Sequence, residues 1–201
     1  MKKTLLSLIT VLAINSYNAQ QSILVINNYT AYDFHTALSA IPSNSCYPSV
    51  EIGYVGNLTN PSQIIVPANS NNMNGQQLMY KNFWDSANPV SNGLYPITTY
   101  WVSTSATNSG PRTAINSTLN PSGPISQNTD WRHAKFYMTY PGTNTTVGTG
   151  STPLTYFLGN LDDGNNTCTT GDTYISTTYG DAELFTITDT SGQKFTYISV
   201  F

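Results

Sequence analysis

The stretch ELFTITDTSGQKFTYISVF, residues 183–201, decides the fold class because it has the form of a β-hairpin. Two runs rich in Thr, Ile, Phe and Tyr, Glu183–Thr188 and Lys194–Phe201, flank the turn-forming segment Asp189–Gly192. β-Branched and aromatic residues favour strands, whereas Asp, Ser and Gly favour turns. The sequence therefore predicts two antiparallel strands here.

The rest of the chain repeats the apolar–polar alternation that is typical of half-buried strands. Between residues 132 and 140, Ala134 and Phe136 fall on one face and His133 on the other. Such runs predict about ten short strands, the hairpin included, the others being Ser22–Asn27, Thr30–Ala40, Val50–Val55, Gln63–Val66, Ile97–Ser103, Arg132–Tyr140, Leu154–Leu158 and Thr173–Thr178. Gln76–Trp84 fits a helix or a strand, and Thr104–Asp130 and Pro141–Pro153 show no clear element.

Many short strands separated by turns favour an all-β antiparallel sandwich or jelly roll. The alternative is an eight-stranded outer-membrane barrel, whose terminal signal resembles the alternating Phe195 and Tyr197 and the final Phe201. Ser199 interrupts that alternation. In addition, few of the predicted strands reach the roughly nine residues that a spanning strand needs. We therefore expect the sandwich.

The first residues have the layout of a secretory signal peptide. Lys2 and Lys3 precede an apolar run, and a short polar region then leads to Ala19. This three-part pattern predicts cleavage after Ala19, and the apolar run is too short to span a bilayer. We expect a leader over residues 1–19 and a single all-β domain over residues 20–201, secreted, periplasmic or on the cell surface.

Charge excludes two classes of partner. Once Lys2 and Lys3 leave with the leader, five Lys/Arg face ten Asp/Glu, a formal net charge of −5. Nucleic acid and anionic lipid both require clustered Lys and Arg, so neither is an expected partner. Only 8% of the residues are charged, against about 25% in typical domains, which leaves a polar surface built from Asn, Ser and Thr.

The chain has two cysteines, Cys46 and Cys168. In an oxidising compartment the expected state is one structural disulfide, worth about 4–5 kcal/mol for a loop of this length. The alternative is a catalytic thiol, which would need a nearby base.

Hydrolytic chemistry has weak support in the sequence. No Gly-x-Ser-x-Gly motif is present, and His35 and His133, the two histidines, fall on polar faces of predicted strands, where surface positions are expected. Glycoside hydrolysis needs two carboxylates about 5–10 Å apart. Asp181 and Glu183 fit that separation on one strand, in a region that is rich in acids. The simpler interpretation is a solvated acidic rim.

Two arrangements suggest a metal. Asp33 and His35 share a strand face, and His133 would join them if its strand were adjacent. The oxygen donors Asp162, Asp163 and Asn165 suit Ca²⁺, although the segment lacks the EF-hand spacing and its terminal Glu. A turn is the simpler interpretation of the second arrangement, and we expect no cofactor unless Ca²⁺ binds there.

Aromatic residues point to recognition. Trp84, Trp131 and Tyr137 lie near polar and charged residues in the sequence. Sugars bind by stacking on such rings while amides and hydroxyls hold their OH groups. We therefore expect non-covalent binding of a glycan or another extracellular surface. The alternatives are an extracellular glycosidase-like hydrolase that uses acids of residues 162–183, and a structural or self-assembling surface protein. The oligomeric state is left open.

Two kinds of modification signal occur. Five Asn-x-Ser/Thr sequons begin at Asn28, Asn57, Asn116, Asn144 and Asn166. Asp85-Ser86-Ala87 resembles the short O-glycosylation motif of Bacteroidota.

Overall fold

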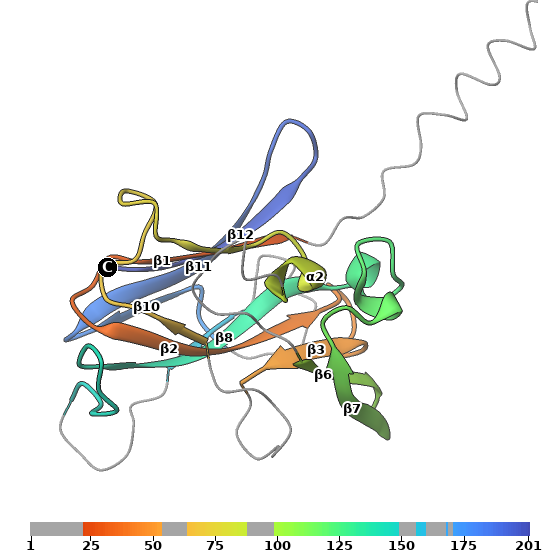
Figure 1. The fold of residues 1–201 in the computed structure, drawn as a ribbon, viewed down its shortest axis with the longest axis horizontal. Helices are drawn as coiled ribbons and strands as arrows, with labels where there is room; N and C mark the ends of the chain where they lie inside the picture. Colours follow the sequence, from red (N-terminus) through yellow and green to blue (C-terminus); the bar gives the residue numbers. More distant parts are fainter. Residues whose placement is uncertain (1–21, 54–63, 88–98, 149–155, 160–167, 169–170) are drawn as a thin grey trace, which may run out of the picture.

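Two β-sheets face each other in the computed structural model, which describes residues 22–53, 64–87, 99–148, 156–159, 168 and 171–201 (Figure 1). The first sheet has the order β10 (Tyr174–Thr177), β11 (Gly180–Thr188), β12 (Lys194–Val200), β1 (Ile23–Asn28) and β5 (Leu78–Tyr80). The second has the order β7 (Asn108–Thr113), β6 (Thr99–Ser105), β3 (Ser49–Ile52), β2 (Asp33–Ile41), β8 (Asp130–Thr139) and β9 (Tyr156–Leu158). β4 (Ile64–Val66) pairs with β2 beyond the end of β3.

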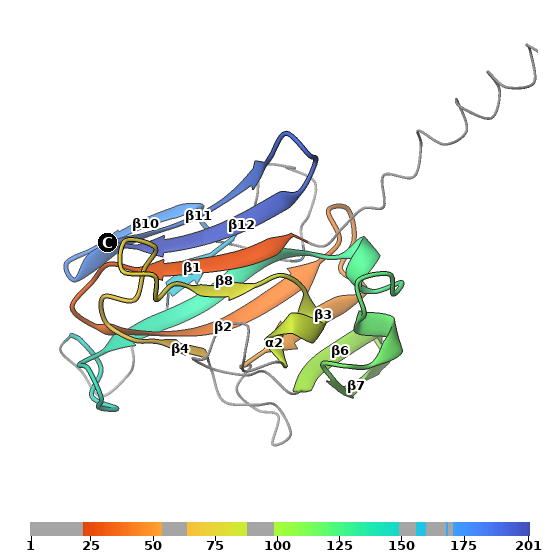
Figure 2. The same ribbon diagram turned by 45° about the horizontal axis from the view of Figure 1, so that its top comes forward.

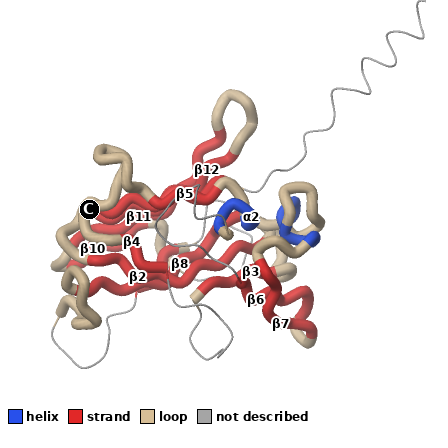
Figure 3. The backbone as a smooth tube through the Cα atoms, in the orientation of Figure 1, coloured by secondary structure: helices blue, strands red, loops and turns tan. Residues whose placement is uncertain are grey.

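The layers confirm the all-β sandwich. Both sheets are open, each ending in an edge strand on either side, and the described strand-to-strand pairings are antiparallel except for β1 with β12, apart from an isolated parallel bridge between Leu158 and Asp172. Figure 2 shows the first sheet stacked over the second. The helical segments α2 (Phe83–Ser86), Ser117–Leu119 and Ser126–Asn128 gather at one end of the sandwich (Figure 3).

Apolar side chains of the two inner faces form one core. Strands of the first sheet contribute Leu24, Ile26 and Ile198, and those of the second contribute Phe34 and Phe136, whose tilted rings are in contact; all five residues are buried. Burial of apolar surface is worth about 25 cal/mol per Å², so this shared layer is the main force that holds the sheets together.

The C-terminal hairpin is confirmed. β11 and β12 pair antiparallel, with Leu184 opposite Ile198 on the core side. In the turn, Asp189 Oδ1 accepts hydrogen bonds from the backbone N–H groups of Ser191 and Gln193. Gly192 has φ 87°, a conformation that favours glycine.

The described residues form twelve strands, against about ten predicted. The ambiguous segment Gln76–Trp84 splits into β5 and the start of α2. The stretch Thr104–Asp130, for which no element was predicted, contains β7 and the two 3₁₀ turns. β7 shows no alternation because it is an edge strand that carries Gly110 and Pro111 and buries no side chain fully.

The predicted disulfide joins Cys46 and Cys168, with their Cα atoms 5.3 Å apart. Such a bond is consistent with an oxidising extracellular compartment. No helix within the described ranges has the length and hydropathy that crossing a membrane requires. The expected leader and its cleavage after Ala19 lie outside the described residues.

Candidate functional site

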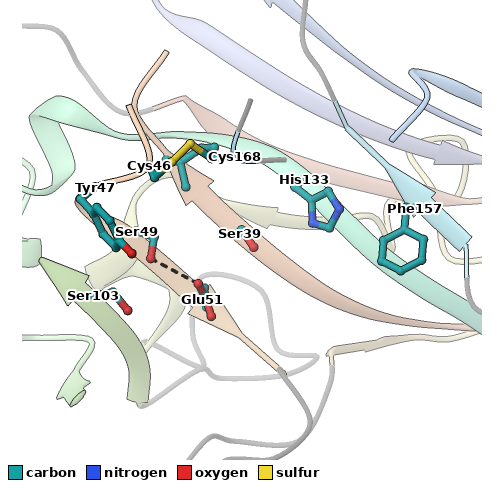
Figure 4. Close-up of a pocket in the computed structure, with 10 residues that line it drawn as sticks. Ser39, Cys46, Tyr47, Ser49, Glu51, Ser103, His133, Phe157 and Cys168 are labelled. Carbon is teal, nitrogen blue, oxygen red and sulfur yellow. Dashed lines mark hydrogen bonds between the residues drawn. A yellow bond between two sulfur atoms is a disulfide. The ribbon is translucent and has the colours of Figure 1, made fainter. Parts of the chain in front are cut away.

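A pocket of about 430 Å³ lies on the outer face of the second sheet, the face turned away from the core (Figure 4). Its floor is polar, and the side chains that make it come from four strands: Ser103 of β6, Ser49 and Glu51 of β3, Ser39 of β2 and His133 of β8. Tyr47, Phe157 and the disulfide stand around it.

Strand register brings the central residues of the pocket together. Glu51 pairs with Ser39 across β3 and β2, and Ser39 pairs with His133 across β2 and β8. The three side chains thus form one row across the sheet. Because neighbouring strands are about 4.8 Å apart, the backbones that carry Glu51 and His133 are separated by about 10 Å. The pocket therefore has an acid at one side and an imidazole at the other.

A β-bulge in β8 decides which side chains reach the pocket. The register shifts where Ala40 pairs with Trp131 while the preceding Ser39 pairs with His133, which leaves Arg132 as the extra residue. Regular alternation would put residues 131 and 133 on the same face. With the bulge, Trp131 enters the core and His133 lines the pocket, a re-aiming that bulges commonly produce.

Among the described residues that line the pocket, Glu51 is the only carboxylate. Ser49 donates a hydrogen bond of 3.2 Å from its hydroxyl to Glu51 Oε1. Burial raises the pKa of the Glu51 carboxyl because it removes water from the charged form, and the Ser49 hydrogen bond opposes that shift only in part. The carboxylate is therefore incompletely compensated by the protein.

Aromatic rings stand at opposite ends of the pocket. Tyr47 rises beside Ser49 and Ser103, and Phe157 lies beyond His133 (Figure 4). Both rings are exposed, and the rings of Phe157 and His133 are 5.9 Å apart. Lys135 holds its Nζ 5.3 Å from the centre of the Phe157 ring, which is a cation–π distance. Hydroxyls and ionisable groups between two exposed rings can bind a small polar molecule that also has apolar faces.

The acids singled out in the sequence lie elsewhere. Asp181 and Glu183 belong to β11 of the first sheet, and the pocket belongs to the second. The Tyr174 hydroxyl donates a hydrogen bond to Asp181, and this bond is the main reason that the pKa of Asp181 is lowered. A lowered pKa keeps a carboxyl ionised, whereas a general acid needs a raised one.

The three aromatic residues predicted to bind a ligand have different environments. Trp131 is 2% exposed and packs edge-on against Phe83 in the core, so its ring is not available to a ligand. Trp84 is 39% exposed on α2, and its Nε1 donates a hydrogen bond to the backbone oxygen of Asn116. Tyr137 is on the same face as the pocket but stacks on His35, with ring centres 4.8 Å apart. Neither Trp84 nor Tyr137 lines the pocket.

Surface positions were expected for both histidines, and both are buried. His35 Nε2 makes a hydrogen bond with the Thr139 hydroxyl, and burial lowers the pKa of the ring. The carboxylate of Asp33, on the same face of β2, accepts hydrogen bonds from the backbone N–H groups of Ala68 and Gly142. These side chains were expected on a solvent-facing side, but β2 is a central strand that is buried along its whole length.

In the described residues, His133 does not join Asp33 and His35. His133 pairs with Ser39, four residues along β2 from His35, which is about 13 Å at the usual rise per residue. No three side chains of His, Cys, Asp and Glu converge within the described ranges. The candidate Ca²⁺ ligands Asp162, Asp163 and Asn165 lie outside the described residues.

The glycosylation motifs differ in their exposure to solvent. Ser86 of the Asp-Ser-Ala motif is 1% exposed, and its hydroxyl donates to the Phe83 carbonyl oxygen, so a glycosyl group has no access to it in the folded protein. The Asn28 sequon is also buried, whereas Asn144 is exposed. The sequons at Asn57 and Asn166 lie outside the described residues.

Comparison with known proteins finds no family, no curated protein and no solved structure that this chain matches. Sequence reasoning did not single out Glu51, Ser39 or Ser49. One signal was available: Glu51 is the only charged residue of the predicted strand Val50–Val55, on the face opposite to Val50 and Ile52.

Proposed function

We propose that this is a secreted protein that binds a glycan non-covalently, with one sugar residue held in the pocket of the second sheet. The observation that carries the proposal is the row Glu51–Ser39–His133, which lies between the exposed rings of Tyr47 and Phe157. Carboxylate, hydroxyl and imidazole groups hydrogen-bond to sugar hydroxyls, and aromatic rings stack on the apolar faces of sugars.

The rigidity of the site supports the proposal. The row lies on three adjacent strands in the middle of a six-stranded path, and Ser39 and His133 are buried. Side chains fixed in this way lose little conformational entropy when a ligand binds, which favours affinity. The disulfide and the three-part leader support the secreted location in which glycans are met.

A glycan array followed by NMR titration of the best ligand tests the proposal. The variant Phe157→Ala removes a 45% exposed ring from the pocket, and Tyr174→Ala removes a 50% exposed ring from the other sheet as a matched control. A stacked aromatic ring contributes about 0.5–1.5 kcal/mol, so the first variant should weaken binding roughly three- to tenfold and the control should not. Equal loss in both variants would place the ligand away from the pocket.

A second candidate function, self-assembly, is favoured by the outer face of the first sheet. Phe185 and Tyr197 stack there with ring centres 5.2 Å apart, next to the exposed Ile187. Contiguous exposed apolar residues are typical of interaction surfaces. Analytical ultracentrifugation over a range of concentrations tests this candidate: association that Ile187→Lys abolishes would support it, and a monomer at every concentration would reject it.

A further inference from the structure

Among the described residues, the carboxylate of Glu51 forms no ion pair. The ion pairs among the described residues join Arg132 and Lys194 to Asp130, and none of them involves Glu51. The segments outside the description add no basic residue beyond the leader, because Lys2 and Lys3 are the only Lys or Arg in them. A half-buried negative charge without a countercharge favours a cationic group on a ligand that enters the pocket.

The surroundings of Glu51 suit an ammonium group. Ser49 occupies one acceptor site of the carboxylate, which has about four lone-pair sites, so sites remain for a ligand. Trp101 of β6 pairs with Glu51 on the same face of the sheet, but it is not one of the described residues that line the pocket. An ammonium bound to a carboxylate gains a charge-assisted hydrogen bond.

The opposite end of the pocket disfavours a second positive charge. His133 lies two strands away from Glu51, and the Lys135 ammonium lies beyond it over Phe157. The hydroxyl of Ser39 adds no formal charge between these ends. A complementary ligand therefore has one cationic group at the β3 side and neutral hydroxyls toward β8.

We propose that the sugar held in this pocket is an amino sugar with a free amine, whose ammonium group binds Glu51. This inference rests on the proposed function, since it names the class of sugar that the same site selects. An N-acetylated or neutral sugar offers Glu51 only neutral donors, which make hydrogen bonds about half as strong as charge-assisted ones.

The test is an NMR titration of the secreted protein near neutral pH with glucosamine, N-acetylglucosamine and glucose. We expect glucosamine to bind roughly tenfold more tightly than glucose, with shifts at the pocket residues. Glu51→Gln keeps the shape of the side chain and should bring the ratio of the two affinities close to one. Glu183→Gln, on the other sheet, is the matched control and should leave the ratio unchanged. Circular dichroism of both variants establishes that they fold.

Three outcomes would overturn the inference, and they are distinguishable. A ratio near one in the unaltered protein, with measurable glucose binding in the pocket, rejects the amino sugar and leaves the proposed function standing. A tenfold ratio that persists in Glu51→Gln places the amine elsewhere. Failure of all three sugars to shift the pocket residues, together with no binding on the array, rejects the inference and the proposed function together.

Discussion

Removal of the Cys46–Cys168 disulfide gives the most quantitative prediction for stability. The bond closes a loop with a sequence separation of 122 residues. In the chain-entropy model a loop of that length loses about 16 cal/mol/K, or about 5 kcal/mol at room temperature. Both cysteines are exposed, so replacing them with serine adds little cost from packing. We therefore expect the variant Cys46→Ser/Cys168→Ser to lose about 4–5 kcal/mol.

Equilibrium unfolding in urea measures this loss. With a slope of about 2 kcal/mol/M, the midpoint of the double variant should lie about 2 M below that of the oxidised protein. The reduced protein with both cysteines is the control and should match the variant. Because both cysteines line the pocket, the variant should also bind a ligand more weakly. A midpoint shift below roughly 0.5 M, or less than about 1 kcal/mol, would refute the entropic argument.

Three further predictions concern single residues. Trp131→Ala should lower the free energy of unfolding by about 3–5 kcal/mol because it leaves a cavity in the core. Trp84→Ala removes a partly exposed ring and should lower it by less than about 1.5 kcal/mol. Urea unfolding of the two variants measures the difference. Asp33→Ala leaves two backbone N–H groups without their acceptor and should cost about 1–3 kcal/mol, which thermal unfolding would detect; no loss would contradict the role of Asp33. The folded-state pKa of Glu51 is raised, so its contribution to stability falls as pH rises through that pKa. Glu51→Gln should therefore raise the melting temperature near neutral pH, and this increase should disappear below the unfolded-state pKa of about 4.3. An increase in melting temperature that is the same at every pH would contradict the raised pKa of Glu51.

Local pattern was enough to predict much of the fold. The C-terminal hairpin follows from two β-rich runs around an Asp-Thr-Ser-Gly turn, and both its strands pair as expected. The sequence did not predict β7, because Gly110 and Pro111 are unfavourable in strands. β7 is an edge strand that is held in place by its pairing with β6. The two-sided burial of β2 was also missed, since alternation predicts one solvent-facing side for a strand that is in fact central.

Local sequence pattern could not predict the candidate site, because its residues come from separate strands. Glu51 and His133 are 82 positions apart in the sequence and meet Ser39 only through the registers of β3 and β8 against β2. The bulge at Arg132 adds to the difficulty, because strict alternation would place Trp131 and His133 on one face. Asp181 and Glu183 were predicted as candidate catalytic acids because they are close in sequence. Closeness in sequence cannot identify groups that are brought together from different strands.

A titration with glucosamine, followed by NMR in the unaltered protein and in Glu51→Gln, tests whether the pocket at Glu51 binds a sugar. We predict saturable shifts at Glu51, Ser39 and His133, with an affinity that falls roughly tenfold in the variant. Saturable binding that shifts only residues of the first sheet, or binding that is unchanged in Glu51→Gln, would contradict this prediction.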